Sequence, residues 1–163
     1  MRRWLAAAWA LAALPAAAAD APTFTVRLLT PETALKATQA ALTKCRAGGF
    51  QVAVAVVDRS GIPQALIRDR FASPASIDIA QRKAQTAASF RMDTSALDRE
   101  LQPGRPTAGL RGVASIVAVA GGKPIEAGGA LLGGIGVSGA PGPQNDEMCA
   151  AAGIAAIAED LEF

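Results

Sequence analysis

The sequence contains no histidine among its 163 residues. Histidine is the commonest general base and metal ligand in proteins, because its imidazole changes charge near neutral pH. Its absence excludes serine–histidine and cysteine–histidine catalytic pairs, in which the imidazole activates the nucleophile. It also excludes a tetrahedral zinc site, because the chain has only two cysteines to offer as soft ligands. Carboxylates and lysines are the side chains left for acid–base chemistry.

Aromatic side chains and net charge are also scarce. The chain has no tyrosine, and both tryptophans lie in the first nine residues. Its 16 basic residues include Arg2 and Arg3, and without these two the chain has 14 residues of each sign and is formally neutral. Nucleic-acid binding needs a basic surface and usually aromatic side chains on which bases stack. Nucleic acid is therefore excluded as a partner.

The N-terminus has the three parts of a secretory signal peptide. Arg2 and Arg3 form a positive start, an apolar run extends over 4–14, and three alanines precede Asp20. A membrane anchor is the alternative, but the run is shorter than the ~20 residues that span a bilayer, and Pro15 interrupts it. We predict that residues 1–19 are removed and that residues 20–163 form a single exported domain, periplasmic or secreted, with no membrane contact after cleavage.

The two cysteines, Cys45 and Cys149, would be exported with the rest of the chain. A disulfide forms and persists in an oxidising compartment. Both cysteines lie in segments that we predict to be helical and that could pack side by side. We expect a Cys45–Cys149 disulfide, with two buried free thiols as the alternative.

Cap and turn residues divide the chain into helices and strands. Threonine or serine followed by proline marks two helix starts, at Thr30-Pro31 and at Ser73-Pro74. The apolar spacing predicts helices over 30–47, 73–90, 94–101 and 145–160, and strands over 50–57, 62–68, 113–120 and 130–137. This order predicts an α+β fold, with a central antiparallel sheet of about five strands and N-terminal, middle and C-terminal helices packed on it.

Residues 134–139, Gly-Ile-Gly-Val-Ser-Gly, match the dinucleotide-binding pattern G-x-G-x-x-G. That pattern requires a helix beginning at the glycines and an acidic residue about 20 positions later. Here a proline- and glycine-containing loop delays the helix, so we expect no nicotinamide or flavin cofactor. We expect instead a strand whose glycines let another backbone or a ligand approach closely.

Charged residues suggest two further kinds of site. A basic cluster could receive an anionic ligand or form surface salt bridges; it comprises Arg68, Arg70, Arg82, Lys83 and Arg91. Scattered carboxylates could hold a hard cation or be solvated at the surface; they are Asp58, Asp69, Asp78, Asp146 and Glu147. The loop over 138–145 ends at a predicted helix start, which suits a carboxylate or phosphate, although capping by Asn145 explains it equally well.

Five segments, taken in order, resemble the GlcG/HbpS family of haem-binding-like domains. They are 52–61 (VAVAVVDRSG), 83–87 (KAQTA), 121–125 (GGKPI), 134–139 (GIGVSG) and 146–150 (DEMCA). The resemblance implies an α+β fold with a central antiparallel sheet, assembly into homo-oligomers and, for some exported members, binding or degradation of haem. Other relatives are encoded with glycolate utilisation or fused to cobalamin-related enzymes.

The leading hypothesis is an exported protein that binds a small molecule, either haem or a similar planar anionic ligand. Neither histidine nor tyrosine is available to bind the haem iron, which leaves Met92, Met148 or a hydroxyl. We expect the ligand between the Gly121–Gly122 turn, the 138–145 loop and the helix face that carries Arg82 and Lys83. The candidate ligand-binding residues are Arg82, Lys83, Gly121, Gly122, Ser138, Gly139 and Asp146.

Two alternatives remain open at this point. One is an enzyme that acts on a small organic acid, with Asp58, Lys83 or Asp146 as acid–base groups tuned by burial. The other is a non-catalytic structural subunit of an oligomer. A strongly perturbed titration of one of these groups in a deep pocket would favour the enzyme, and the absence of a pocket would favour the structural subunit.

Overall fold

One antiparallel sheet lies between two layers of helices. The computed structural model describes residues 22–161, so the predicted signal peptide lies outside the described residues. Within them the strands are β1 (Ala53–Asp58), β2 (Pro63–Arg68), β3 (Gly122–Ala127) and β4 (Ala130–Ser138). Their order is β2-β1-β4-β3, so β2 and β3 are the edge strands. The α+β class is confirmed, but the sheet of the described chain has four strands rather than about five.

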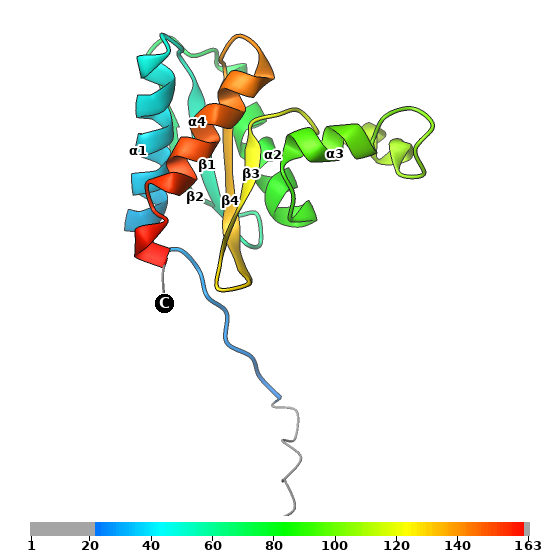
Figure 1. The fold of residues 1–163 in the computed structure, drawn as a ribbon, viewed down its shortest axis with the longest axis horizontal. Coiled ribbons are helices and arrows are strands. Elements are labelled where there is room, and N and C mark those ends of the chain that lie inside the picture. Colours follow the sequence, from blue (N-terminus) through cyan, green and yellow to red (C-terminus); the bar gives the residue numbers. More distant parts are fainter. Residues whose placement is uncertain (1–21, 162–163) are drawn as a thin grey trace, which may run out of the picture.

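The helices cover both faces of the sheet. Helices α1 (Pro31–Ala47) and α4 (Pro143–Ala155) lie side by side on one face, and α2 (Ala75–Phe90) covers the other (Figure 1). The short α3 (Thr94–Glu100) extends away from the sheet, and 3₁₀ turns follow at Ala108–Gly112 and Glu159–Leu161. No helix of residues 22–161 has the length and hydropathy needed to cross a membrane.

Strand β1 is apolar on both sides because it lies in the middle of this sandwich. Val54 and Val56 belong to the core that α1 and α4 close, whereas Ala53 and Ala55 pack against Ala80 of α2. All of these side chains are fully buried. A strand covered on both faces has an uninterrupted apolar sequence instead of an alternating one.

The glycines of β4 bring α2 into direct contact with the sheet. A Cβ atom at Gly136 would lie 2.0 Å from the Ala80 carbonyl oxygen, and one at Gly134 would lie 2.4 Å from that of Ala84. No side chain fits at either position. The structure therefore agrees with the expectation that these glycines admit another backbone, and that backbone is α2.

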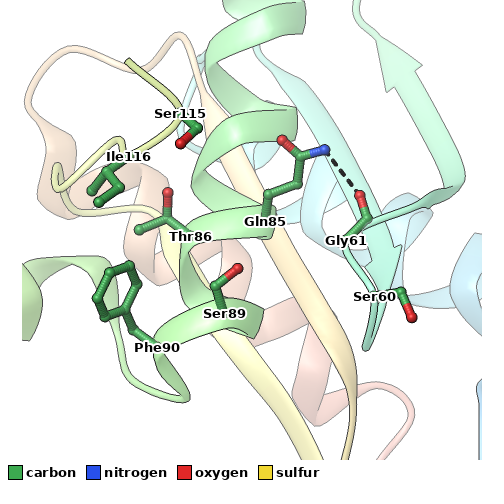
Figure 2. Close-up of a pocket in the computed structure, with 8 residues that line it drawn as sticks. All are labelled: Ser60, Gly61, Gln85, Thr86, Ser89, Phe90, Ser115 and Ile116. Atoms are coloured by element: carbon green, nitrogen blue, oxygen red, sulfur yellow. Dashed lines mark hydrogen bonds between the residues drawn. The ribbon is translucent and has the colours of Figure 1, made fainter. Parts of the chain in front are cut away.

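The strand predicted over 113–120 is wrong. This segment is a loop that runs beside α2 (Figure 2), where the Val117 amide donates a 3.0 Å hydrogen bond to Thr86 Oγ1. Its apolar residues are explained by Ala118, which is buried against Leu97 and Leu101 in a small cluster outside the sheet. The apolar composition that resembled a strand therefore reflects side-chain packing without strand pairing.

The Gly121–Gly122 turn is shorter than the Gly-Gly-Lys-Pro sequence of 121–124 suggests, because β3 begins at Gly122. Pro124 lies within this strand, opposite Gly134 of β4. Proline cannot donate a ladder hydrogen bond, but an edge strand tolerates it because one side of the strand has no neighbour. The two-residue turn of the β3–β4 hairpin is instead Gly128–Gly129, where both residues have positive φ angles.

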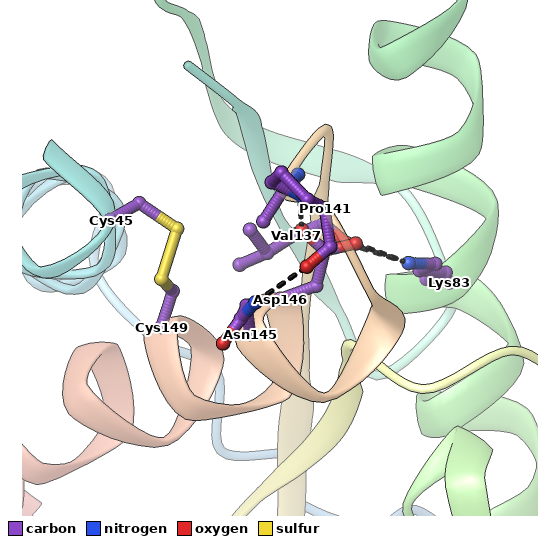
Figure 3. The surroundings of a disulfide bond; sticks show 8 residues. Cys45, Lys83, Val137, Pro141, Asn145, Asp146 and Cys149 are labelled. Carbon is purple, nitrogen blue, oxygen red and sulfur yellow. Dashed lines mark hydrogen bonds and ion pairs between the residues drawn. A yellow bond between two sulfur atoms is a disulfide. The ribbon is translucent and has the colours of Figure 1, made fainter. Parts of the chain in front are cut away.

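A disulfide joins the two helices on one face of the sheet. Cys45 of α1 and Cys149 of α4 are bonded, with their Cα atoms 5.5 Å apart (Figure 3). The expected pairing is thus present, and both cysteines are buried. The bond fixes the first helix to the last, although α4 ends at Ala155, earlier than the predicted Asp160.

Candidate functional site

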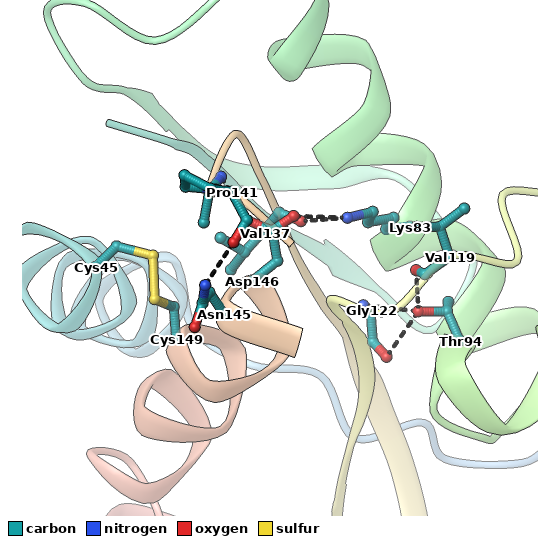
Figure 4. Close-up of polar contacts among 11 residues, drawn as sticks. Cys45, Lys83, Thr94, Val119, Gly122, Val137, Pro141, Asn145, Asp146 and Cys149 are labelled. Atoms are coloured by element: carbon teal, nitrogen blue, oxygen red, sulfur yellow. Dashed lines mark hydrogen bonds and ion pairs between the residues drawn. A yellow bond between two sulfur atoms is a disulfide. The ribbon is translucent and has the colours of Figure 1, made fainter. Parts of the chain in front are cut away.

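An ion pair is buried where α2, β4 and α4 meet. Lys83 Nζ of α2 lies 2.9 Å from Asp146 Oδ2 of α4, and their side chains are only 2% and 5% exposed. The same ammonium group donates a 3.0 Å hydrogen bond to the Val137 carbonyl (Figure 4). A buried charge is costly unless it is paired and hydrogen-bonded, and this pair meets both conditions. Two candidate residues from opposite faces of the sheet are therefore in direct contact.

The Gly121–Gly122 turn packs directly on this pair. A Cβ atom at Gly121 would lie 2.9 Å from Lys83 Nζ and 2.8 Å from Asp146 Cβ. One at Gly122 would lie 2.4 Å from the Lys83 carbonyl oxygen. The Gly122 amide donates a 2.9 Å hydrogen bond to Thr94 Oγ1, which ties the turn to α3 (Figure 4). Glycine is required here because the turn closes over the ion pair.

The loop after β4 is held by the second oxygen of Asp146. The Ala140 amide donates a 3.0 Å hydrogen bond to Asp146 Oδ1. Ser138 is buried at the end of β4, and Gly139 has a φ angle of +130°, which favours glycine. Six of the seven candidate ligand-binding residues therefore belong to one connected region around Lys83 and Asp146.

Arg82 is the exception, because its contacts lie elsewhere. Its guanidinium forms an i,i+4 ion pair with Asp78 at 2.9 Å, and Nη1 donates a 2.7 Å hydrogen bond to the Ala114 carbonyl. Lys83 is buried while Arg82 is exposed, since consecutive residues of a helix point in different directions. The structure thus separates these two neighbours in sequence, and Arg82 instead anchors the 113–121 loop.

A surface hollow of about 230 Å³ lies outside the buried ion pair, between the turn that precedes β3 and the start of α4. We call it the α3–α4 hollow. Its floor is apolar, with Val119 46% exposed, and Arg99 supplies a cation at its wall. The lining residues are Ser95, Asp98, Arg99, Ala118, Val119, Ala120, Pro143 and Gln144. The 138–145 loop contributes to it as expected, but none of the seven candidate ligand-binding residues lines it, and sequence reasoning missed the contribution of α3.

A second cluster of polar residues, which the sequence analysis missed, joins α3 to β3 and α4. Ser95 Oγ donates a 2.9 Å hydrogen bond to Glu147 Oε1, and Lys123 Nζ lies 3.6 Å from the same oxygen. Lys123 also forms an ion pair with Asp93. No motif in the sequence connects these four residues, because they come from three separate elements. They fix α3 beside the α3–α4 hollow.

The scattered carboxylates do not form a cation site in the described part of the chain. Asp58 accepts hydrogen bonds from the Ser60 and Ile62 amides and so stabilises the β1–β2 turn. Asp69, Asp78 and Asp146 each pair with a different cation. Over residues 22–161 no three acidic or cysteine side chains gather in a way that could hold a metal ion. The carboxylates therefore act as separate structural contacts.

The one carboxyl group whose pKa is clearly displaced lies outside this region, among the described residues. Arg46 Nε and Nη2 each donate a 2.8 Å hydrogen bond to the buried Asp69 carboxylate. These hydrogen bonds lower the pKa of Asp69 to about 2. Asp69 also accepts a hydrogen bond from the Arg70 amide, so the pair holds the segment after β2 against α1. Its role is structural.

Comparison with known proteins identifies relatives over most of the chain. A family model described as haem degrading protein HbpS-like matches residues 29–155. No curated protein sequence matches the chain. The family match covers all four strands and all four α-helices of the described chain, and it includes every candidate ligand-binding residue.

Solved structures with the same fold include several related in sequence. A double mutant of HbpS from Streptomyces reticuli is 41% identical, with a TM-score of 0.77 over 88% of this chain and 97% of that one. A structure described as a PduOC:heme complex is 30% identical, with a TM-score of 0.76 over 80% of this chain and 95% of that one. The protein ORFY of Klebsiella pneumoniae is 26% identical, with a TM-score of 0.82 over 86% and 98%.

Proposed function

The chain belongs to the HbpS-like family of haem degrading proteins, and on that premise we propose that it is an exported protein that binds haem or a similar planar, anionic molecule. The observation that carries the proposal is the family match over residues 29–155, together with a 30% identical relative solved as a heme complex. The α3–α4 hollow, beside a rigid buried ion pair, supplies a place where a ligand can dock.

The α3–α4 hollow fits the charged edge of such a ligand better than a whole porphyrin. Its volume of about 230 Å³ is below the ~300–1,000 Å³ of pockets that enclose drug-sized molecules. Val119 and Pro143 offer apolar contact, and Arg99 offers a guanidinium that can pair with a carboxylate. A ring carrying carboxylates would place them at Arg99 and extend over the exposed surface of α4.

In this arrangement Lys83 and Asp146 are positioning residues. Both are buried and bonded to each other, so neither presents a free charge to a ligand. They hold the Gly121 turn and the Ala140 loop, and the nearby Ala120 and Pro143 line the hollow. Removing either group would displace the walls of the site before it changed any contact with the ligand.

Of the two methionines in the described chain, Met148 is the one more open to a haem iron, and a hydroxyl remains the alternative ligand. Both cysteines are in the disulfide and the chain has no histidine or tyrosine. Met92 packs against the small cluster around Leu97, whereas Met148 on α4 is 53% exposed. Met148 lines a hollow of about 270 Å³ together with Lys44 and Phe50.

Met148 and Gln144 of the α3–α4 hollow are four residues apart on α4, so they lie on the same side of the helix. A porphyrin lying along this side would contact Met148 while its carboxylates face Arg99. The thioether is a known axial ligand of haem iron, and haem bound there would supply redox chemistry that the side chains lack.

A hemin titration tests the proposal. We expect a Soret band displaced from that of hemin in buffer, with affinity reduced about tenfold or more by Met148→Leu, which keeps the volume and removes the sulfur. Met92→Leu is the matched control and should titrate like the wild type. A Soret band that matches hemin mixed with an unrelated histidine-free protein would reject haem as the ligand.

The contacts of the three acid–base candidates favour binding over catalysis on an organic acid. Asp58 accepts two backbone hydrogen bonds in the β1–β2 turn, at 2.7 and 3.0 Å. Lys83 and Asp146 are bonded to one another away from solvent. Each group thus has a structural role.

Export is part of the proposal and has its own support. A disulfide between Cys45 and Cys149 fits an oxidising compartment. We expect the mature protein to begin at Asp20 and to be recovered from the periplasm or the medium. N-terminal sequencing of the recovered protein measures this, and an N-terminus that still contains Arg2 and Arg3 in the cytoplasmic fraction would contradict it.

Self-assembly is also part of the proposal, and β2 is the surface that we assign to it. Strand β2 is an edge strand, and Leu66 on it is 39% exposed. Ile62 just before it is 61% exposed and Phe71 just after it is 80% exposed. Apolar side chains along an open strand edge are typical of a surface that another chain covers. Phe71→Glu should lower the molar mass measured by light scattering, whereas an unchanged mass would exclude this edge.

A further inference from the structure

A second hollow, unrelated to the site above, lies on the outer side of α2. Its volume is about 370 Å³, within the range of small-molecule pockets. Segments from three parts of the chain form it, namely the β1–β2 turn, the C-terminal half of α2 and the loop after Ala114 (Figure 2). We call it the α2 hollow; the side chains used below are Ser60, Gln85, Thr86, Ser89, Phe90 and Ser115.

Both walls of the α2 hollow are fixed to the helix by side-chain hydrogen bonds. Gln85 Nε2 donates a 2.9 Å bond to the Gly61 carbonyl and holds the β1–β2 turn. On the other side, Arg82 donates to Ala114 and Thr86 accepts from the Val117 amide, at 2.7 and 3.0 Å. The hollow is therefore formed before any ligand arrives, which reduces the entropic cost of binding.

The lining is uncharged and combines several hydroxyl groups with the apolar side chains of Phe90 and Ile116. Ser60, Ser89 and Ser115 are exposed at the hollow, and each hydroxyl can donate one hydrogen bond and accept others. The amide nitrogen of Gln85 is bonded to Gly61, so its oxygen remains as an acceptor toward the Ser115 side (Figure 2). None of the lining residues is ionisable near neutral pH, and the nearby Arg82 is paired with Asp78.

Phe90 adds an apolar face at one end of the hollow. A ligand that matches these features carries several hydroxyl groups, has no charge and presents one C–H face to an aromatic ring. We propose that the α2 hollow binds a neutral polyol of about the size of a monosaccharide. The ligand differs in charge and in place from the planar anion of the α3–α4 hollow, so the two proposals are independent.

Saturation-transfer NMR on the disulfide-bonded protein, with D-glucose and myo-inositol as probes, tests this proposal. Transfer to the probes should be seen for the wild type and be lost in Ser89→Leu, where a larger side chain fills the hollow. Leucine has a high helix propensity and Ser89 is exposed, so this variant should fold. Thr43→Leu, an exposed position on α1, is the matched control and should retain transfer.

Three results would overturn the polyol site. One is the absence of transfer to both probes at millimolar concentration, and another is equal transfer in the wild type and in Ser89→Leu. The third is stronger binding of D-gluconate than of D-glucose, because a negative charge has no partner in this hollow. Saturation with hemin should leave the transfer to glucose unchanged, because the proposed haem site is the α3–α4 hollow. A failed hemin titration would therefore not affect the polyol proposal.

Discussion

Lys83 and Asp146, 63 residues apart in sequence, meet at 2.9 Å in the interior between α2 and α4. The contact crosses the plane of the sheet and ends under a glycine turn that leaves no room for a side chain. It thus connects both helical layers to the β3 edge. This pair lies at the centre of the candidate site. Both charges are needed to hold the surrounding turn and loop in place.

Removing one member of the pair should be strongly destabilising. Lys83→Met leaves the Asp146 carboxylate buried without its cation, which costs about 3–5 kcal/mol of unfolding free energy. Lys83→Met combined with Asp146→Leu removes both charges and should recover most of that loss. Urea denaturation of the three proteins measures this. If the unfolding free energy of Lys83→Met lay within about 1 kcal/mol of that of the wild type, the pair would not contribute to stability.

Gly121 should not tolerate even alanine. Its φ angle is +121°, and a Cβ atom would lie 2.7 Å from the Val137 carbonyl oxygen. Backbone strain and overlap together predict a loss of about 2–4 kcal/mol for Gly121→Ala. Gly109→Ala is the control, because nothing lies within 4 Å of a Cβ atom there. Its thermal midpoint should match the wild type, and an equal loss in both variants would refute the argument.

The local structure was predictable wherever neighbouring residues determine it. Thr30 and Pro31 predicted the start of α1, and the Thr30 hydroxyl does accept a 3.2 Å hydrogen bond from the Thr33 amide. The apolar run over 50–57 predicted β1 because a strand buried on both faces needs no polar residue. The hairpin with β2 followed from the turn residues between the two runs.

The errors came from contacts between residues far apart in sequence. The 113–120 segment has the composition of a strand, but Thr86 and Leu101 supply the hydrogen bond and the packing that replace a sheet partner. Lys83 appeared to be a surface cation because its partner, Asp146, lies in another helix. Arg82 appeared equivalent to Lys83 in sequence, although the helix directs the two side chains apart.

The disulfide should contribute substantially to stability. It closes a loop over a sequence separation of 104 residues, and removal of a native disulfide costs about 2–5 kcal/mol. Cys45→Ala with Cys149→Ala should lower the urea midpoint accordingly. In the wild type, mass spectrometry after alkylation without reduction should detect no added alkyl group. Addition of two groups would mean that the thiols are free.

Stability should fall in acid as Asp69 becomes protonated. Arg46 lowers the pKa of Asp69 to about 2 in the folded protein, below the value of about 4 for an unfolded aspartate. A lowered folded-state pKa gives stability that is fully present above pH ~4 and is lost as the pH falls toward ~2. As the pH is lowered from ~4 to ~2, the thermal midpoint should decrease less in Asp69→Asn than in the wild type. Parallel curves for the two proteins would contradict this assignment.

The most direct test of the central claim is the identity of the molecule that copurifies with the exported protein. We expect cells supplied with haem to yield protein whose acid–acetone extract contains haem in near-equal molar amount, and Met148→Leu protein to carry much less. Extracts with no haem from the wild type, or equal haem from both proteins, would contradict the account.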